Sequence, residues 1–182
     1  MDKKLYYHVV TERPMEVGQV IYFDDDNHNG VGRRMKAVIS VQTGDFDHKD
    51  PFIKEMVKDP EKWFNILERE TLLESVRQDR YTQYPSRQAC LYVSDSYEDA
   101  LGWADYFIEL GRETYQVVSL SHEGRSFTGD AHNCWYQGGN ESMALAYWEA
   151  TPNSKGLDPI YETIIDGTIQ VEEILKTYKE SS

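Results

Sequence analysis

The sequence predicts an α+β fold in a single domain that spans residues 1–182. The chain has 182 residues, which is the length of one ordinary domain. Hydrophobic residues make up 40% of it, and 13 Tyr and 4 Trp add large apolar side chains, so the chain can bury a core. Strand-like and helix-like segments follow one another without an internal repeat. This mixture is typical of the α+β class.

In the first half, residues 5–10 are rich in Tyr and Val and predict a strand. Residues 20–23 form a short apolar stretch. The Asp- and Asn-rich segment 24–30 predicts a solvated loop, since its carboxylates lack the spacing of a calcium loop. Residues 59–61, an Asp-Pro-Glu sequence, are typical of a helix start, and apolar spacings of three and four continue that helix to about residue 79.

In the second half, residues 90–94 predict a strand that leads into a helix, which Asp95 or Ser96 can cap and Gly111 can end. Another strand is expected at 115–120. The Gly-containing segment 124–139, with Gly138-Gly139 as a turn, predicts a long loop. The short apolar segment 143–148 fits a helix or a strand. Terminal strands are expected at 161–165, 169–171 and 174–175.

Charge and cysteine content exclude several classes of function. The net charge is −13 and the isoelectric point is about 4.7, so a broad nucleic-acid surface is not expected. No apolar run reaches the roughly 20 residues that span a bilayer, and residues 1–8 lack the apolar core of a secretory signal. Two cysteines cannot build a disulfide framework. We therefore expect a soluble cytoplasmic protein without a membrane partner.

Metal and thiol chemistry have little support in the sequence. His132 and Cys134, with His122 nearby, could supply three zinc ligands, but structural zinc usually takes four at tighter spacings. Cys90 lies in an apolar strand, where an inert buried thiol is the usual case. No metal site is predicted.

Three residues in different predicted strands form a more informative set. His8 lies inside the first strand, Tyr92 lies in the strand at 90–94, and Glu162 begins an apolar strand near the end of the chain. Taken singly, each has an ordinary interpretation: a satisfied histidine, a β-favoured core aromatic and a solvent-facing carboxylate.

Together these segments resemble the ADP-ribosyltransferase superfamily, in the His-Tyr-Glu branch of diphtheria toxin and the poly(ADP-ribose) polymerases, as a small bacterial member. Tyr7-His8, with Thr11 downstream, resembles the first motif of that branch. Residues 90–95 are similar to its second strand, and Trp103 stands eleven residues after Tyr92, where the polymerases place a second aromatic. Residues 162–171 loosely match its terminal motif.

The resemblance implies a split β-sheet core with flanking helices and NAD as the substrate. It implies that His8 orients NAD, that Tyr92 and Trp103 enclose nicotinamide, and that Glu162 is the catalytic acid. Ser94 and Thr11 are further candidates for binding NAD. ADP-ribose would pass to an unknown acceptor, a protein or a small molecule.

The sequence also departs from the family pattern. Val9 replaces the common Gly after the motif His, and Ala100 replaces the Ser that binds the nicotinamide amide. Glu149 is a rival to Glu162 for the acidic role. A non-enzymatic module that binds NAD or another nucleotide with the same fold is therefore the alternative. A tRNA 2′-phosphotransferase-like reaction is disfavoured by the acidic charge and by the lack of an Arg- and His-rich site.

Overall fold

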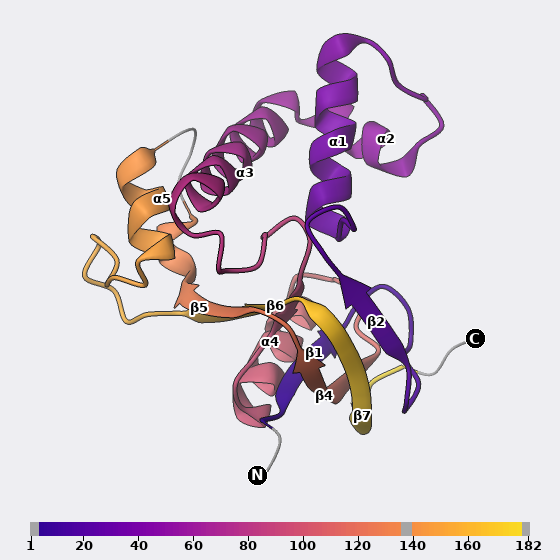
Figure 1. Ribbon diagram of the computed structural model, residues 1–182. Coiled ribbons are helices and arrows are strands. Elements are labelled where there is room, and N and C mark those ends of the chain that lie inside the picture. The colour runs from indigo at the N-terminus through magenta and orange to yellow at the C-terminus, as the bar shows by residue number, and fades with distance from the viewer. Residues whose placement is uncertain (1–3, 136–139, 180–182) are drawn as a thin grey trace. The chain divides into compact units, whose positions relative to one another are not determined.

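Two antiparallel sheets and five α-helices form the part of the chain that the computed structural model describes, residues 4–135 and 140–179 (Figure 1). This confirms the α+β class. The strands are β1 (Tyr6–Val10), β2 (Val20–Phe23), β3 (Leu91–Val93), β4 (Gln116–Glu123), β5 (Ser126–Asp130), β6 (Tyr161–Ile165) and β7 (Gly167–Thr177). The helices are α1 (Gly30–Thr43), α2 (Pro51–Lys58), α3 (Pro60–Arg80), α4 (Tyr97–Glu109) and α5 (Glu141–Trp148), with a 3₁₀ turn η1 (Ala131–Asn133).

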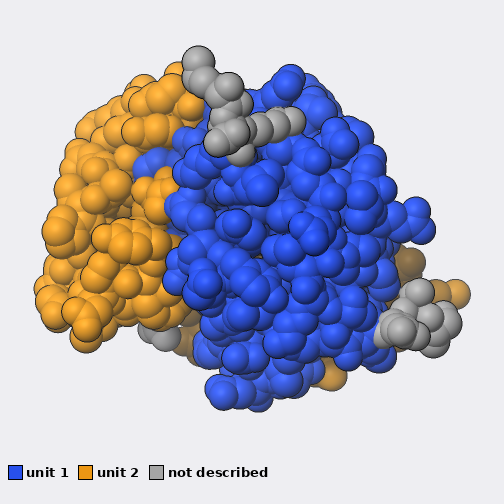
Figure 2. Space-filling view, turned by 90° about the horizontal axis from the view of Figure 1, so that it is seen from below, with its two compact units in different colours: residues 1–23, 91–127, 162–182 blue, residues 24–90, 128–161 orange. Residues whose placement is uncertain are grey.

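The contacts divide the chain into two compact units, each built from separate segments (Figure 2). Unit 1 comprises residues 1–23, 91–127 and 162–182, and unit 2 comprises residues 24–90 and 128–161. This division into contact units does not test whether residues 1–182 form a single domain, so the single domain stays a prediction.

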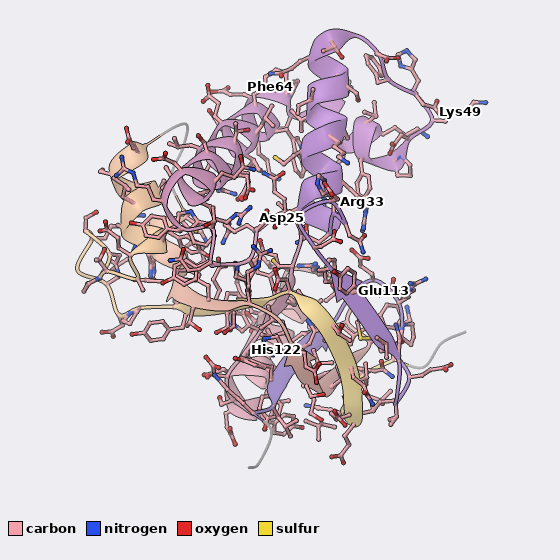
Figure 3. The ribbon with its side chains drawn as sticks, in the orientation of Figure 1. Asp25, Arg33, Lys49, Phe64, Glu113 and His122 are labelled. Carbon is pink, nitrogen blue, oxygen red and sulfur yellow. The ribbon has the colours of Figure 1, made fainter. Side chains whose placement is uncertain are left out.

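The sheets differ in size and order. The four-stranded sheet has the order β1-β4-β7-β2, and the three-stranded sheet has the order β3-β6-β5. β4 and β7 pair over the whole length of β4, with register shifts at Val117/Val118 and Ser119/Leu120. His122 on β4 is labelled in Figure 3.

A glycine lies at each of the adjoining ends of β4 and β7, where the two backbones approach closely. Gly167, the first residue of β7, has φ of 78°, and an added Cβ would collide with the carbonyl oxygen of Glu123. Gly124, which follows β4, would likewise collide with the carbonyl oxygen of Asp166. The Arg125 guanidinium also donates to Asp166, from Nε to Oδ2 at 2.7 Å. Only glycine fits so close a backbone crossing.

Two apolar clusters hold unit 1 together. The core cluster draws on both sheets and contains Tyr6, Val10, Val93, Val118, Leu120, Ile165, Ile169 and Val171. The α4 cluster joins α4 to β1 and β4 and contains Val9, Ala100, Ala104 and Val117, against which Tyr7, Trp103 and Phe107 pack. Ser96 caps α4 by accepting from the Asp99 amide, which is one of the two caps predicted.

Unit 2 has a small helical core of its own, in which Met35, Val38, Met56 and Trp63 come together from α1, α2 and α3. Figure 3 labels Phe64 on α3 and Arg33 on α1 in this region.

A buried ionic network also lies within unit 2. Glu70 accepts from Arg87 Nε at 3.1 Å and from Arg69 Nη2 at 3.0 Å. Arg87 in turn donates to the Tyr147 hydroxyl at 2.8 Å. Burial acts to raise the pKa of Glu70, but the two guanidinium charges outweigh burial and hold this pKa below its usual range.

The predicted elements mostly match the structure. The long helix begins and ends within one residue of the expected bounds, and the segment 143–148 lies in helix α5. The terminal strands after Gly167 are one strand, β7, with bulges. The long loop expected at 124–139 is wrong, because this segment contains β5 and η1; its last residues, 136–139 with the Gly-Gly turn, lie outside the described residues.

Candidate functional site

The strands that carry His8, Tyr92 and Glu162 are neighbours within unit 1. β1 meets the end of β3 through an antiparallel bridge, in which the Tyr7 amide donates to the Ser94 carbonyl at 2.9 Å and the Ser94 amide donates to the Tyr7 carbonyl at 2.7 Å. β3 pairs antiparallel with β6, with Tyr92 opposite Ile164. The fold therefore brings together segments that are 70 or more residues apart in the sequence.

His8 is hydrogen-bonded directly to the backbone of β3. Its Nδ1 lies 2.7 Å from the Tyr92 carbonyl oxygen. A carbonyl oxygen only accepts, so Nδ1 carries the proton, and the neutral ring keeps a lone pair on Nε2. Burial, helped by the positive charge of Arg112, lowers the pKa of His8 from 6.5 to about 4, against the opposing effects of the Tyr92 hydrogen bond and Glu12. His8 is therefore neutral at physiological pH, with an accepting nitrogen.

Tyr92 and Glu162 lie on the same face of the three-stranded sheet. Leu91 and Val93 pack with the core cluster, so alternation along β3 directs Tyr92 to the opposite face. Ile164 pairs with Tyr92, and Glu162 is two residues from Ile164 on β6, so all three share this face. Residues in diagonal positions of this kind are about 7–8 Å apart, within reach of an aromatic side chain. Both Tyr92 and Glu162 are half-buried.

Asp95 fixes β6 to the segment between β3 and α4. Thr163, the neighbour of Glu162, donates from Oγ1 to Asp95 Oδ2 at 3.0 Å. Asp95 also pairs with Lys4 Nζ at 2.8 Å. In the sequence Asp95 stands out as a possible helix cap and as the last residue of the segment 90–95, and neither feature indicates its hydrogen bond to β6.

Ser94 and Thr11 occupy different positions around β1. Ser94 is buried and forms the bridge to Tyr7 with its backbone. Thr11 follows β1, and its hydroxyl oxygen accepts from Arg112 Nη2 at 3.1 Å. Arg112 was not among the residues that the sequence indicated, because it belongs to no motif.

Trp103 packs in the α4 cluster. Its ring centroid lies 5.9 Å from that of Tyr106 and 5.8 Å from that of Phe107. This is the packing expected of a core Trp on an amphipathic helix, and its place in a nicotinamide pocket stays a prediction. The two departures from the family pattern, Val9 and Ala100, are buried in the same cluster.

Glu149, the rival acid, belongs to unit 2. It caps the C-terminal end of α5, and it accepts a hydrogen bond from the Tyr81 hydroxyl at 3.2 Å. Burial and this hydrogen bond both raise the pKa of Tyr81. Glu149 thus has a local structural partner on the loop that follows α3.

A family model described as "Protein of unknown function (DUF2441)" matches residues 6–177. The chain belongs to this family. The matched range contains all six candidate residues, namely His8, Thr11, Tyr92, Ser94, Trp103 and Glu162. A comparison with curated proteins finds no match.

Two further observations concern metals and membranes. Among residues 4–135 and 140–179, no three His, Cys, Asp or Glu side chains are grouped closely enough to hold a metal ion. Across the same described residues, no helix is both long enough and apolar enough to cross a membrane.

Proposed function

We propose that the protein is an NAD-dependent ADP-ribosyltransferase whose site is formed by His8, Tyr92 and Glu162. The observation that supports the proposal most strongly is the convergence of these three residues in unit 1. His8 is hydrogen-bonded to the backbone of Tyr92, and Tyr92 shares a sheet face with Glu162. The same three residue types define the branch that the sequence resembles.

Each side chain suits one part of the substrate. The neutral His8 ring offers Nε2 as an acceptor for a ribose hydroxyl. The half-buried Tyr92 ring can stack on the flat nicotinamide ring, whose positive charge is attracted to the aromatic face. The Glu162 carboxylate can accept from a ribose hydroxyl and stabilise positive charge on the sugar.

The proposed reaction breaks the bond between nicotinamide nitrogen and C1′ of the ribose. The bonding electron pair leaves with the pyridinium nitrogen, which makes nicotinamide a neutral leaving group, while C1′ acquires oxocarbenium character, as in glycoside cleavage. A nucleophile on the acceptor then bonds to C1′ and loses its proton. Glu162 acts on the charge that develops at the sugar, and its effect is therefore expected in kcat.

The alternative is a module of the same fold that binds NAD or another nucleotide without cleaving it. Val9 and Ala100 support it, since both place methyl groups where the polymerases have glycine and serine. An amide that loses one hydrogen bond binds about 1 kcal/mol less tightly. Binding of NAD without release of nicotinamide would favour this alternative.

Incubation with NAD labelled in its ADP-ribose part tests the proposal. The purified chain is incubated alone and with a cell lysate, and nicotinamide release and label transfer are followed together. Release of nicotinamide with transfer of the label supports a transferase, and release alone supports hydrolysis. Tight NAD binding with no release in either incubation would overturn the proposed activity in favour of the binding module.

A further inference from the structure

Arg112 lies directly after α4, in the connection that leads to β4. Its neighbour Glu113 is labelled in Figure 3. Gly111, with φ of 71°, ends α4 in the left-handed region. The Gly111 amide donates to the Ile108 carbonyl and the Arg112 amide donates to the Phe107 carbonyl at 2.9 Å. This is the Schellman pattern, and it turns the chain so that Arg112 returns over the last turn of the helix.

The guanidinium of Arg112 is held at two points. Its Cζ lies 4.6 Å from the centroid of the Phe107 ring. Its Nη2 donates to Thr11 Oγ1 at 3.1 Å, across 101 residues of sequence. The connection is also fixed to β1, because the Tyr115 amide donates to the Val10 carbonyl at 2.8 Å. A cation with this support has lost side-chain freedom before any ligand binds, which reduces the entropic cost of binding.

The position of Arg112 relates it to the candidate site. Thr11, which accepts from Arg112, is three residues beyond His8, and an extended chain rises about 3.3 Å per residue, so Thr11 lies about 10 Å along the chain from His8. The Arg112 charge also acts on the His8 ring, where it disfavours protonation. Arg112 therefore contacts Thr11, itself a candidate for binding NAD, and its charge reaches the His8 ring.

We propose that Arg112 binds the diphosphate of the dinucleotide whose ribose contacts His8. This inference rests on the proposed function, and it assigns the anion-binding part of that site. A planar guanidinium has five N–H donors, so it can donate to phosphate oxygens and retain Thr11. Its charge matters in a chain of net charge −13, where most of the surface repels a dianion.

Glu12 opposes Arg112 at this end of β1. It acts on His8 in the opposite sense, since its negative charge favours protonation of the ring. A dinucleotide would meet this carboxylate as well as the guanidinium. Removal of the Glu12 charge should therefore tighten the binding of anionic ligands, and removal of the Arg112 charge should weaken it.

Calorimetric titration with ADP-ribose, NAD, adenosine and nicotinamide tests the assignment. Arg112→Gln should weaken ADP-ribose and NAD about tenfold, the scale of one lost hydrogen bond between charged groups, and should leave adenosine and nicotinamide within about twofold. Glu12→Gln should strengthen ADP-ribose. Arg13→Gln is the matched control, an exposed arginine in the same segment, and should leave all four ligands within about twofold.

The outcomes separate this inference from the function on which it rests. If Arg112→Gln binds ADP-ribose as tightly as the unmodified chain does, the diphosphate assignment is wrong, and the proposed function still stands. An unmodified chain that binds neither NAD nor ADP-ribose overturns both. Should Arg112→Gln fail to fold, Arg112→Lys retains the charge and loses the planar fork; it should weaken ADP-ribose about threefold, and unchanged affinity would overturn the assignment.

Discussion

Substitution of His8 should change how the stability of the protein depends on pH. The pKa of His8 is about 4 in the folded chain, because burial disfavours the charged ring, and about 6.5 in the unfolded chain. Below pH 6.5 the unfolded state binds a proton that the folded state does not, so stability falls as the pH is lowered towards 4. Between pH 7 and pH 5 this linkage amounts to about 2 kcal/mol of unfolding free energy.

His8→Asn is the variant to compare with the unmodified protein. The amide nitrogen of Asn can donate to the Tyr92 carbonyl as Nδ1 of His8 does, but the Asn side chain does not titrate. Urea unfolding of both proteins at pH 7 and pH 5 gives the two free-energy losses. The loss should be about 2 kcal/mol smaller for the variant, because every other titrating group is common to both proteins. Equal losses, or an NMR titration of His8 near pH 6.5, would refute the reasoning that His8 is neutral and desolvated.

Three further substitutions test the packing of the fold and one wall of the site. Gly167→Ala should destabilise the chain by more than about 3 kcal/mol, because the residue has φ of 78° and its added Cβ would meet the Glu123 carbonyl. Gly102→Ala on α4 is the control: its Cβ meets nothing within 4 Å, and it should stabilise slightly. Equal thermal midpoints for the two variants would contradict the close approach of the Gly167 and Glu123 backbones. Glu70→Gln should lower the free energy of unfolding in urea by about 3–5 kcal/mol, because it leaves Arg87 charged and buried. Arg80→Gln, which removes an exposed ion pair with Asp79, should leave the urea midpoint unchanged. A similar shift of the urea midpoint in both variants would count against the buried network. Trp103→Ala should remove NAD-induced quenching of tryptophan fluorescence if this ring borders nicotinamide, and quenching that survives would restrict Trp103 to packing.

Local patterns predicted the elements whose signals lie within a few residues. The helix that begins after Asp59 has its cap, its proline and its apolar spacing in one stretch, and the strand at 161–165 is a clear β-favouring run. β5 was missed because its sequence, Ser-Phe-Thr-Gly-Asp, has one large apolar residue; its strand conformation comes from its pairing in the sheet beside β6, which the sequence does not record.

No element was assigned between residues 31 and 58, where α1 and α2 occur. Asn29 caps the start of α1, and Gly44, with φ of 76°, ends the helix. Both residue types are typical of helix ends, so the sequence contained a start and a stop signal for this helix. The apolar face of α1 is narrow, with Met35 and Val38 as its buried large side chains, and Arg33, Arg34 and Lys36 stand close to Met35 in the sequence. Capping residues alone did not outweigh that mixed pattern.

In the candidate site, too, local sequence patterns predicted the residue types but not the long-range contacts. The residue types at positions 8, 92 and 162 could be selected from strand context and from a family resemblance. The hydrogen bond from His8 to the Tyr92 carbonyl joins residues 84 apart, and the contact of Arg112 with Thr11 joins residues 101 apart. Such contacts depend on how β1, β3 and α4 pack, and one sequence does not specify that packing locally.

The most direct test of the central claim is the turnover of Glu162→Gln with NAD, measured as nicotinamide release, beside Glu149→Gln as the control. The amide retains the size of the side chain and removes its charge. If Glu162 stabilises charge in the transition state, NAD affinity should be kept and kcat should fall by two to three decades, or about 2.7–4 kcal/mol, while Glu149→Gln stays near the unmodified rate. A kcat for Glu162→Gln within about twofold of the unmodified protein, with loss of turnover in Glu149→Gln, would contradict the assignment of the acid.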